Sequence, residues 1–306
     1  MRPAVAYGTT VGGAASWGLT GFFVQYLYEF GLAPIEVVTI RMVLSAIVMF
    51  IIVGVVRPYL LKIHWRDLPY FIGLGVVSIA FFNWCYFTVM EEANLSIAVV
   101  LLYTSPVFVA ILSRIFFKEK LTGNKIIAII LTLLGCSFVA GLLPGESMSI
   151  SGTVLLIGAA SGFFCSLYSV IGKFVSMKYS SITITAYAML CGGLFLLPVS
   201  GIEKNTQPLM EPVMWGYAMG SVLISTILAY IMYTAGLRYI ESSHAAILST
   251  VEPIVAIAVG VTVFQDVLTI WQTVGILLVF TSILLSIFSR KRKFKHQKEK
   301  TVPKLS

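Results

Sequence analysis

The sequence predicts an all-α membrane protein in which ten transmembrane helices form two inverted five-helix repeats. Three observations carry this expectation: an apolar composition, ten apolar stretches of membrane-spanning length, and a segment that recurs without a gap. Of the 306 residues, 58% are hydrophobic and 11% are charged, and the mean hydropathy is +0.95. A soluble domain carries about 25% charged residues. The chain therefore has too few polar side chains to cover a soluble globule, and it suits a bilayer.

Ten apolar stretches are long enough to cross the hydrocarbon core of a bilayer, which needs about 20 residues. In chain order they cover residues 4–27, 35–56, 69–90, 94–117, 124–143, 152–173, 182–200, 213–237, 244–264 and 270–289. Polar residues, prolines and glycines separate them, as in RPYLLKIHWRD and LLPGESMSIS. We therefore expect a first repeat over residues 1–145, a second over residues 146–289, and a basic tail over residues 290–306.

The basic residues fall on one side of the membrane when the N-terminus is placed in the cytoplasm and the spans alternate. Nineteen of the 21 Lys and Arg residues then lie in cytoplasmic segments, while Lys204 lies outside and Arg41 lies within the second span. Such an excess in cytoplasmic segments is the usual signature of topology. We expect both termini in the cytoplasm and the protein in a bacterial plasma membrane. The basic tail would contact anionic lipid, so the net charge of +8 calls for no nucleic-acid partner.

An internal match over two spans supports the two-repeat arrangement. Residues 86–122 align with residues 233–269 without a gap. The matched pairs include Tyr86 with Tyr233, Ser96 with Ser243, Pro106 with Pro253, Phe117 with Phe264 and Glu119 with Asp266. Because five is an odd number of spans, the second repeat enters the membrane from the opposite side. Inverted repeats are typical of secondary transporters, whose substrate site lies near the midplane between the halves.

Four motifs carry a resemblance to a known family. They are SWGLTGFF in the first span, RMVLSAIVMF in the second, TSPVFVAILSRIFFKEKLT in the fourth, and VEPIVAIAVGVTVFQDVLTIWQTVGILLVFTSILLS in the last two. From about residue 8 to residue 289 the chain resembles the EamA family of the drug/metabolite transporter superfamily. The resemblance implies two inverted halves around a central cavity and transport of small metabolites, often outward. The turn FQDVLT departs from the family, which more often has Gly-Glu there, and a later glycine of the family pattern is missing after Gly275.

Glu252 stands near the middle of the ninth span, where an ionisable group costs about 2.5–3.5 kcal/mol. It must therefore face the bundle interior or a watery cavity. Pro253 removes the helical hydrogen bond to the carbonyl of Ser249. That carbonyl and the hydroxyls of Ser249 and Thr250 would then lie near the carboxylate. We interpret Glu252 as a contact for a cationic part of the substrate or as a proton carrier. The alternative is a buried residue that only holds helices together.

Arg41 is a second charge within a span, about a third of the way in from the outer face. Its candidate partners are Glu36, five residues earlier, and Glu252 across the bundle. An arginine can also bind a substrate carboxylate through two parallel hydrogen bonds. The alternative is an Arg41 that snorkels to the interface or joins helices.

Polar and aromatic side chains within the spans complete the set of candidates. Buried hydroxyl and indole groups need hydrogen-bond partners, and a buried amide is costly unless it is paired. The candidates in spans that line the cavity of the EamA family are Trp17, Asn83, Tyr86, Tyr103, Tyr168 and Tyr233. The equivalent prolines Pro106 and Pro253 are candidate hinges of the fourth and ninth spans.

The sequence contains no catalytic or metal-binding signature. The three histidines are far apart, the four cysteines form no CxxC pair, and HExxH, GxSxG and P-loop motifs are absent. We therefore expect no enzyme, metal or cofactor.

We expect instead a secondary transporter that exports amino acids or related small metabolites by alternating access, with protons as a candidate coupling ion. A transporter of a larger sugar conjugate or lipid carrier, and a non-transporting membrane scaffold, remain alternatives. A monomer and a homodimer fit the sequence equally well.

Overall fold

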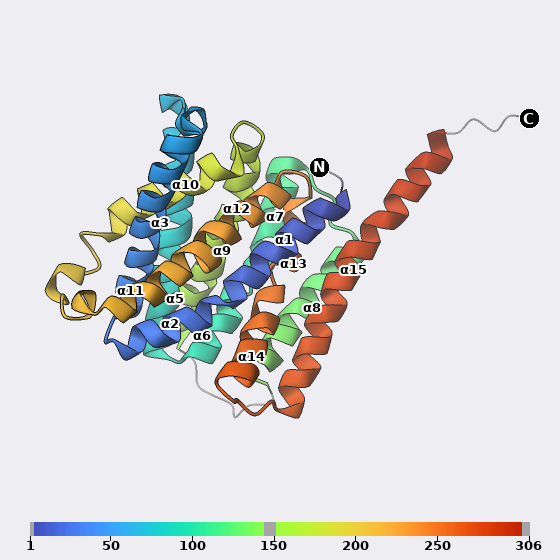
Figure 1. Ribbon diagram of the computed structural model, residues 1–306. Coiled ribbons are helices and arrows are strands. Elements are labelled where there is room, and N and C mark those ends of the chain that lie inside the picture. The colour runs from blue at the N-terminus through green and yellow to red at the C-terminus, as the bar shows by residue number, and fades with distance from the viewer. Residues whose placement is uncertain (1–2, 144–150, 302–306) are drawn as a thin grey trace, which may run out of the picture.

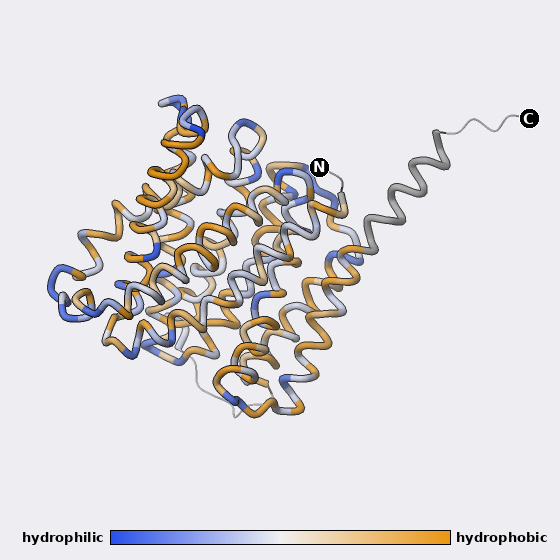
Figure 2. The backbone as a smooth tube through the Cα atoms, viewed as in Figure 1, coloured by the Kyte–Doolittle hydropathy of each residue, from blue (hydrophilic) through white to orange (hydrophobic). Residues whose placement is uncertain are grey.

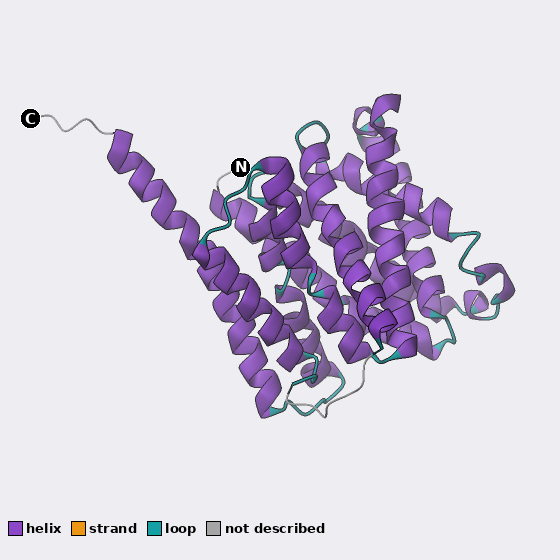
Figure 3. Cartoon of the chain, turned by 180° about the vertical axis from the view of Figure 1, so that it is seen from behind, coloured by secondary structure: helices purple, strands orange, loops and turns teal. Residues whose placement is uncertain are grey.

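The computed structural model describes the backbone of residues 3–143 and 151–301, and the side chains of residues 4–143 and 151–287. Every regular element in these ranges is helical (Figure 3). The helices lie side by side in one bundle, and the last helix, α15 (Ile270–Thr301), extends beyond it (Figure 1). The expected boundary between the repeats at residue 145 lies outside the described residues, as do the side chains of the basic tail.

Within the described residues, seven helical stretches are long and apolar enough to cross a membrane. They are Pro34–Val56, Trp65–Glu92, Leu95–Phe117, Gly152–Ser176, Pro212–Leu237, Ser242–Val263 and Ile270–Ile287. Two shorter apolar helices, α8 (Gly123–Val139) and α10 (Ser181–Leu196), lie among them. Apolar residues predominate along the helices (Figure 2), and large apolar side chains such as Ile51 and Val55 are exposed. The chain is a multi-pass membrane protein.

The predicted first span is divided into two helices in the structure. α1 (Pro3–Gly18) and α2 (Thr20–Glu29) meet at Leu19, and neither is long enough to cross a membrane by itself. The α1 backbone approaches a distant part of the chain at this junction. A Cβ atom at Gly18 would lie 2.6 Å from the carbonyl oxygen of Glu252. The sequence did not predict this division, which places the end of α1 against the ninth predicted span.

The fourth and ninth predicted spans are each divided before a proline. α6 (Leu95–Leu102) is followed by α7 (Ser105–Phe117), and α13 (Ser242–Leu248) is followed by α14 (Val251–Val263). Pro106 and Pro253 lie in the first turns of α7 and α14. A helix tolerates proline there because the first N–H groups have no partner within the helix. We call these two junctions the α6–α7 corner and the α13–α14 corner.

The remaining helices pack across the two halves of the chain. They are α3 (Pro34–Val56), α4 (Leu68–Ile72), η3 (Gly73–Ala80), α5 (Phe81–Glu92), α9 (Gly152–Ser176), α11 (Pro212–Gly220), η6 (Ser221–Leu228) and α12 (Ala229–Leu237). Short 3₁₀ turns lie between helices: η1 (Pro58–Leu61), η2 (Trp65–Asp67), η4 (Ile202–Lys204) and η5 (Pro208–Met210). α1 packs on α12 and α14, and α9 packs on α5 and α7. α3 packs on α10, and α8 packs on α15. The segments η3 and η6 are eight-residue π-helices.

The bundle has two ends with different loops. We call one the basic end, which carries residues 57–67, 118–122, 177–180 and 238–241. We call the other the mouth end, which carries residues 30–33, 93–94, 197–211 and 264–269. Hydrogen bonds join loops of the two halves at both ends, as described below.

Candidate substrate cavity

A cavity of about 920 Å³ lies between helices of both halves. Its wall includes residues of α1, α3, α5, α9, α12 and α14. It reaches the mouth end, where Leu95, Ser96 and the loop residues Asp266, Val267 and Leu268 line it. The described loops of the basic end contribute no lining residue. The cavity is therefore open at the mouth end and closed at the basic end.

Glu252 and Arg41 lie on the wall of this cavity. Glu252 belongs to the first turn of α14, and no hydrogen bond or ion pair of its carboxylate occurs among the described residues. No carboxylate of the described chain pairs with Arg41 within 4.0 Å. The two charges thus line the same cavity but are not joined. A solute in the cavity would meet an acid and a base at separate points.

Arg41 has different partners from those the sequence suggested. Its Nε donates to the hydroxyl of Thr226 (3.1 Å), and its Nη2 donates to the carbonyl of Ser225 (3.2 Å). Glu36 instead accepts hydrogen bonds from the N–H of Ala33 (2.7 Å) and from the Asn205 amide (2.9 Å). Arg41 therefore connects α3 of the first half to the π-helix η6 of the second.

Aromatic rings form one side of the cavity. The Trp17 ring contacts the rings of Tyr230 and Tyr233, with centroids 5.0 and 4.9 Å away, and Tyr168 contacts Tyr230 at 5.0 Å. The Tyr168 hydroxyl is bonded to the Thr234 hydroxyl (2.9 Å). All four rings line the cavity. With this hydroxyl paired within the protein, the ring of Tyr168 offers mainly an apolar surface to a solute.

Three other candidates line the same cavity: Asn83, Tyr86 and Tyr103. The Asn83 amide donates to the carbonyl of Ile79, four residues earlier (2.7 Å), which satisfies part of its hydrogen-bonding capacity. The π-helix η3 ends one residue after Ile79, so the pair connects the cavity wall to this irregular segment. Pro253 also lines the cavity, whereas Pro106 is buried outside the lining.

The α13–α14 corner is more tightly bonded than the proline alone suggests. The carbonyl of Ser249 accepts a hydrogen bond from the N–H of Glu252 (3.0 Å), because the chain tightens to a three-residue spacing there. The Ser249 hydroxyl donates to the carbonyl of Ala246 (2.8 Å), and the Thr250 hydroxyl donates to the carbonyl of Ile247 (2.6 Å). Ser249 lines the cavity, but Thr250 is fully buried and does not.

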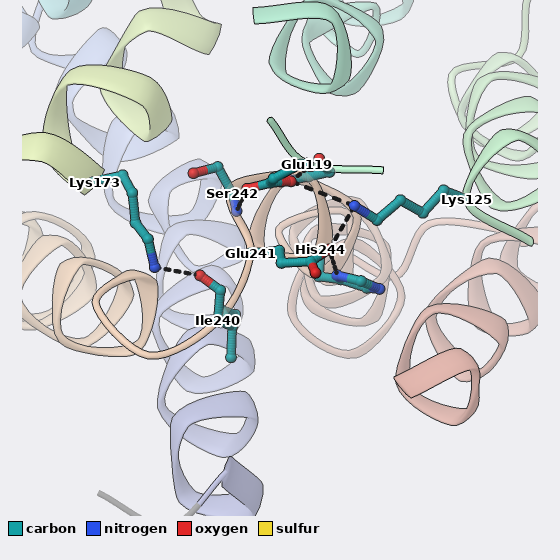
Figure 4. Close-up of polar contacts among 8 residues, drawn as sticks. Glu119, Lys125, Lys173, Ile240, Glu241, Ser242 and His244 are labelled. Carbon is teal, nitrogen blue, oxygen red and sulfur yellow. Dashed lines mark hydrogen bonds and ion pairs between the residues drawn. The ribbon is translucent and has the colours of Figure 1, made fainter. Parts of the chain in front are cut away.

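A buried polar network closes the basic end, and none of the candidate site residues predicted from the sequence belongs to it (Figure 4). Glu119 accepts hydrogen bonds from the N–H groups of Ser242 (2.8 Å) and Ser243 (3.3 Å). Lys125, which is 1% exposed, lies 3.3 Å from Glu119 and 2.6 Å from Glu241. Glu119 and Lys125 come from the first half and the others from the second, so the network joins the halves. The sequence feature that could have pointed to this network is the gap-free match of Glu119 with Asp266.

Two further contacts hold the basic end. His244 Nδ1 lies 3.2 Å from the Glu241 carboxylate. The contact with His244, together with Lys125, lowers the pKa of Glu241 well below its ordinary value of 4.5. Lys173 donates to the carbonyl of Ile240 (2.6 Å; Figure 4). It also donates to the carbonyl of Leu237 (2.7 Å) and so caps the C-terminus of α12. Among the described residues no group of three or more His, Cys, Asp or Glu is arranged to hold a metal.

A multi-pass helical bundle with a central cavity that is open at one end and closed at the other is the architecture expected of a membrane transporter. The profile of the EamA-like transporter family matches the chain twice, over residues 5–141 and 152–288. The protein belongs to the EamA-like transporter family.

Relatives of similar length carry transporter names. An uncharacterized transporter of Archaeoglobus fulgidus is 27% identical over 283 residues, which cover 90% of this chain and 95% of the relative. The uncharacterized inner membrane transporter YicL of Salmonella typhimurium is 24% identical, with 91% and 94% covered. A solved crystal structure superposes with a TM-score of 0.77 at 16% identity, covering 94% of this chain and 98% of the other. At that identity the superposition supports the fold alone.

Proposed function

We propose that the protein is a secondary transporter that exports small amphipathic metabolites such as amino acids by alternating access. The observation that carries the proposal is the difference between the two ends of the cavity. It is open at the mouth end, and a buried network that joins the two halves closes the basic end. Such a difference is what one state of a rocking two-half transporter requires.

The proposed topology has ten spans and two inverted halves, residues 1–145 and 146–289, in the cell membrane. α1 with α2 would form the first span, and α8 and α10 would be the fifth and seventh. Backbone features support the repeat: among the described residues, the non-glycine residues with positive φ are Lys118 and Gln265, which are 147 positions apart, as in the gap-free match. The π-helices η3 and η6 also lie in equivalent third spans. The basic end would then face the cytoplasm, together with both termini.

The proposed substrate class follows from the chemistry of the wall. An unpaired carboxylate at Glu252 and the guanidinium of Arg41 suit the ammonium and carboxylate groups of a zwitterion. The rings of Trp17, Tyr168 and Tyr230 suit an apolar side chain. A cavity of about 920 Å³ is at the upper end of the range for small-molecule sites, roughly 300–1,000 Å³. Glu252 would bind the ammonium group or carry a proton in exchange for it.

The test is counterflow in liposomes that contain the purified protein. A mixed pool of amino acids and related metabolites is offered with and without a pH gradient. We expect uptake of a zwitterionic solute, steeper with the gradient, and a rate at least about tenfold lower in Glu252→Gln, which corresponds to roughly 1.4 kcal/mol. Glu91→Gln is the matched control, because Glu91 is exposed and lies outside the lining.

Three outcomes would contradict parts of the proposal. Normal counterflow by a properly inserted Glu252→Gln protein would remove Glu252 from binding and coupling. Uptake that is indifferent to the pH gradient would leave Glu252 a binding residue without proton coupling. No counterflow of any small solute by the wild-type protein would reject the proposed substrate class and favour a larger substrate.

A further inference from the structure

Glu119 holds the basic end closed by capping a helix of the opposite half. Its Oε1 accepts the Ser242 N–H at 2.8 Å, and its Oε2 accepts the Ser243 N–H at 3.3 Å and the Ser243 hydroxyl. These N–H groups belong to the first turn of α13, where no carbonyl within the helix can accept them. A carboxylate is also favoured there by the partial positive charge of a helix N-terminus. We call this contact the basic-end lock.

The turn that carries Glu119 has a counterpart at the mouth end. Lys118 (φ 55°) and Gln265 (φ 61°) adopt the same left-handed conformation, which is uncommon for residues other than glycine. The N–H of Glu119 donates to the carbonyl of Ser113 (3.2 Å), and the N–H of Asp266 donates to that of Gly260 (3.1 Å). Each of these pairs is related by 147 positions. The backbone therefore presents Asp266 at the mouth end as it presents Glu119 at the basic end.

The residues that would receive Asp266 are already at the mouth. The counterparts of Ser242 and Ser243 are Leu95 and Ser96, the first two residues of α6. Their N–H groups, like those at the start of α13, have no partner within the helix. Leu95, Ser96 and Asp266 all line the open cavity. The side chain of Asp266 is exposed, and the described residues offer it no hydrogen bond or ion pair.

Other bonds between the halves are formed at both ends in the same structure. At the mouth end Asn205 donates to the carbonyl of Gly31 (3.0 Å) and to Glu36 (2.9 Å). At the basic end the Thr183 hydroxyl donates to the carbonyl of Leu60 (2.6 Å), and Lys178 pairs with Asp67. These bonds join α3 and α10, or the loops beside them, to the opposite half. The lock at Glu119 differs from them, because it is made at one end and open at the other.

We propose that Asp266 is the mouth-end counterpart of Glu119 and closes the mouth by capping α6. In that state its carboxylate accepts the N–H groups of Leu95 and Ser96 and the Ser96 hydroxyl, while Glu119 releases α13. The proposal rests on the alternating access proposed above and names the residues that close each end. The two locks exclude each other, because the rocking motion that brings one helix to its carboxylate withdraws the other.

One substitution between the halves makes the two locks unequal. The counterpart of the buried Lys125 is Gln272, which is neutral and caps the start of α15 by accepting the Thr269 N–H (3.0 Å). The mouth lock therefore lacks the cation that supports Glu119. A charge-assisted contact is stronger than a neutral one, so the state closed at the basic end is the more stable of the two when the cavity is empty.

The experiment measures how fast a thiol in the cavity reacts from the mouth side. Cys165 lines the cavity and serves as the probe once Cys85, Cys136 and Cys191 are replaced by serine or alanine. A membrane-impermeant maleimide is added to intact cells without substrate. Glu119→Gln is expected to slow the labelling about tenfold, because it removes hydrogen bonds to a charged group and shifts the protein toward the mouth-closed state. Adding Asp266→Asn is expected to restore fast labelling.

The control and the milder variants keep the test decisive. Glu211→Gln, an exposed carboxylate of the mouth end outside the cavity, should not restore labelling in the Glu119→Gln protein. Should Glu119→Gln fail to accumulate, Ser243→Ala weakens the same lock and leaves Lys125 with its partner Glu119. In that case Ser96→Ala is used in place of Asp266→Asn. Labelling that stays slow after Asp266→Asn, or that never slows when the basic-end lock is weakened, would overturn the proposal.

This readout is independent of the transported solute. Failure of wild-type counterflow with the expected labelling pattern would reject the proposed substrates and leave the locks in place. Normal counterflow, together with a Cys165 labelling rate that Asp266→Asn does not change, would reject the mouth lock and leave the transporter assignment untouched.

Discussion

The turn after α7 and the turn after α14 have the same backbone shape but different surroundings. Lys118 and Gln265 share a left-handed conformation, and an acidic residue follows each. At the basic end Glu119 is buried against α13 and beside Lys125, whereas Asp266 is exposed at the edge of an open cavity. Equivalent sequence thus specifies the local turn, and the packing of the halves decides whether the acid is capped or solvated.

The two ends also differ in charge, because the basic end has the buried Lys125 where the mouth end has the neutral Gln272. A carboxylate buried with a lysine is favourable only when both groups are well bonded, since each loses its water. Lys125 satisfies this with Glu119 and Glu241, and Glu119 adds the N–H groups of α13. The neutral Gln272 needs no such compensation and can lie at an open mouth. Among substitutions at the two ends, the largest effect on stability is expected at Glu119.

Alanine at position 119 should be far more damaging than alanine at position 266. Glu119→Ala leaves Lys125 buried with one carboxylate fewer and uncaps α13, so we expect a loss of about 3 kcal/mol or more in unfolding free energy. Asp266→Ala alters an exposed side chain and should stay within about 0.5 kcal/mol. Thermal unfolding of the purified proteins in detergent measures both. Equal melting temperatures would show that the two ends do not differ as described.

The two corners, in contrast to the two ends, should respond alike. A Cβ atom at Gly18 would lie 2.6 Å from the carbonyl oxygen of Glu252, and one at Gly162 would lie 2.9 Å from that of Leu101. Gly18→Ala and Gly162→Ala should therefore each destabilise the protein by roughly 1–3 kcal/mol through overpacking. Gly21→Ala is the control, because nothing lies within 4 Å of its added Cβ. A large effect at one corner only would mean that the halves are not equivalent there.

Much of the fold follows from the sequence because bilayer solvation makes apolar length a strong signal. The described residues contain seven apolar helical stretches of spanning length and two shorter apolar helices, as an all-α membrane protein requires, but the division at Leu19 was missed. It depends on the close approach of Gly18 to α14, which no local pattern records. The prolines did indicate the two corners. The boundary between α6 and α7 nevertheless lies at Tyr103 and Thr104, where a helix ends before the proline instead of bending through it.

The candidate site was harder to anticipate. The cost of a charge within a membrane span pointed to Glu252 and Arg41, and both line the cavity. The partners of Arg41 could not be inferred, because the Ser225 carbonyl and the Thr226 hydroxyl are neutral and do not stand out in the sequence as counter-charges. The basic-end network was missed because Lys125 and Glu241 lie in loops or at helix ends, where membrane topology alone accounts for charged residues. Their proximity depends on the docking of the two halves.

Bonds that are present at both ends should stabilise the protein without favouring either state. Asn205→Ala removes two hydrogen bonds near the surface of the mouth end, so we expect a loss of about 1 kcal/mol in unfolding free energy. Labelling of Cys165 from the mouth side should be unchanged. A clear change in the labelling rate would place Asn205 in the gate and remove the distinction between the locks and the other contacts.

The smallest expected effect is the pH dependence that Glu241 gives to the basic end. Its contact with His244, and then Lys125, lowers its pKa from the ordinary 4.5. A carboxylate with a lowered pKa contributes stability that is complete above pH 4.5 and is lost as the pH falls below that value, because the unfolded chain takes up the proton first. The side chain is 39% exposed, so solvent screening keeps the contribution within about 1 kcal/mol.

The difference in melting temperature between the wild type and Glu241→Gln should therefore shrink as the pH falls from 7 to about 4. Glu211→Gln, at the mouth end, should differ from the wild type by the same small amount throughout. If the wild type and Glu241→Gln kept a constant difference across this range, the carboxylate would bind protons equally in the folded and unfolded chains. The ionic contacts of Glu241 would then contribute nothing to holding the basic end closed, and the buried pair of Glu119 with Lys125 would act alone.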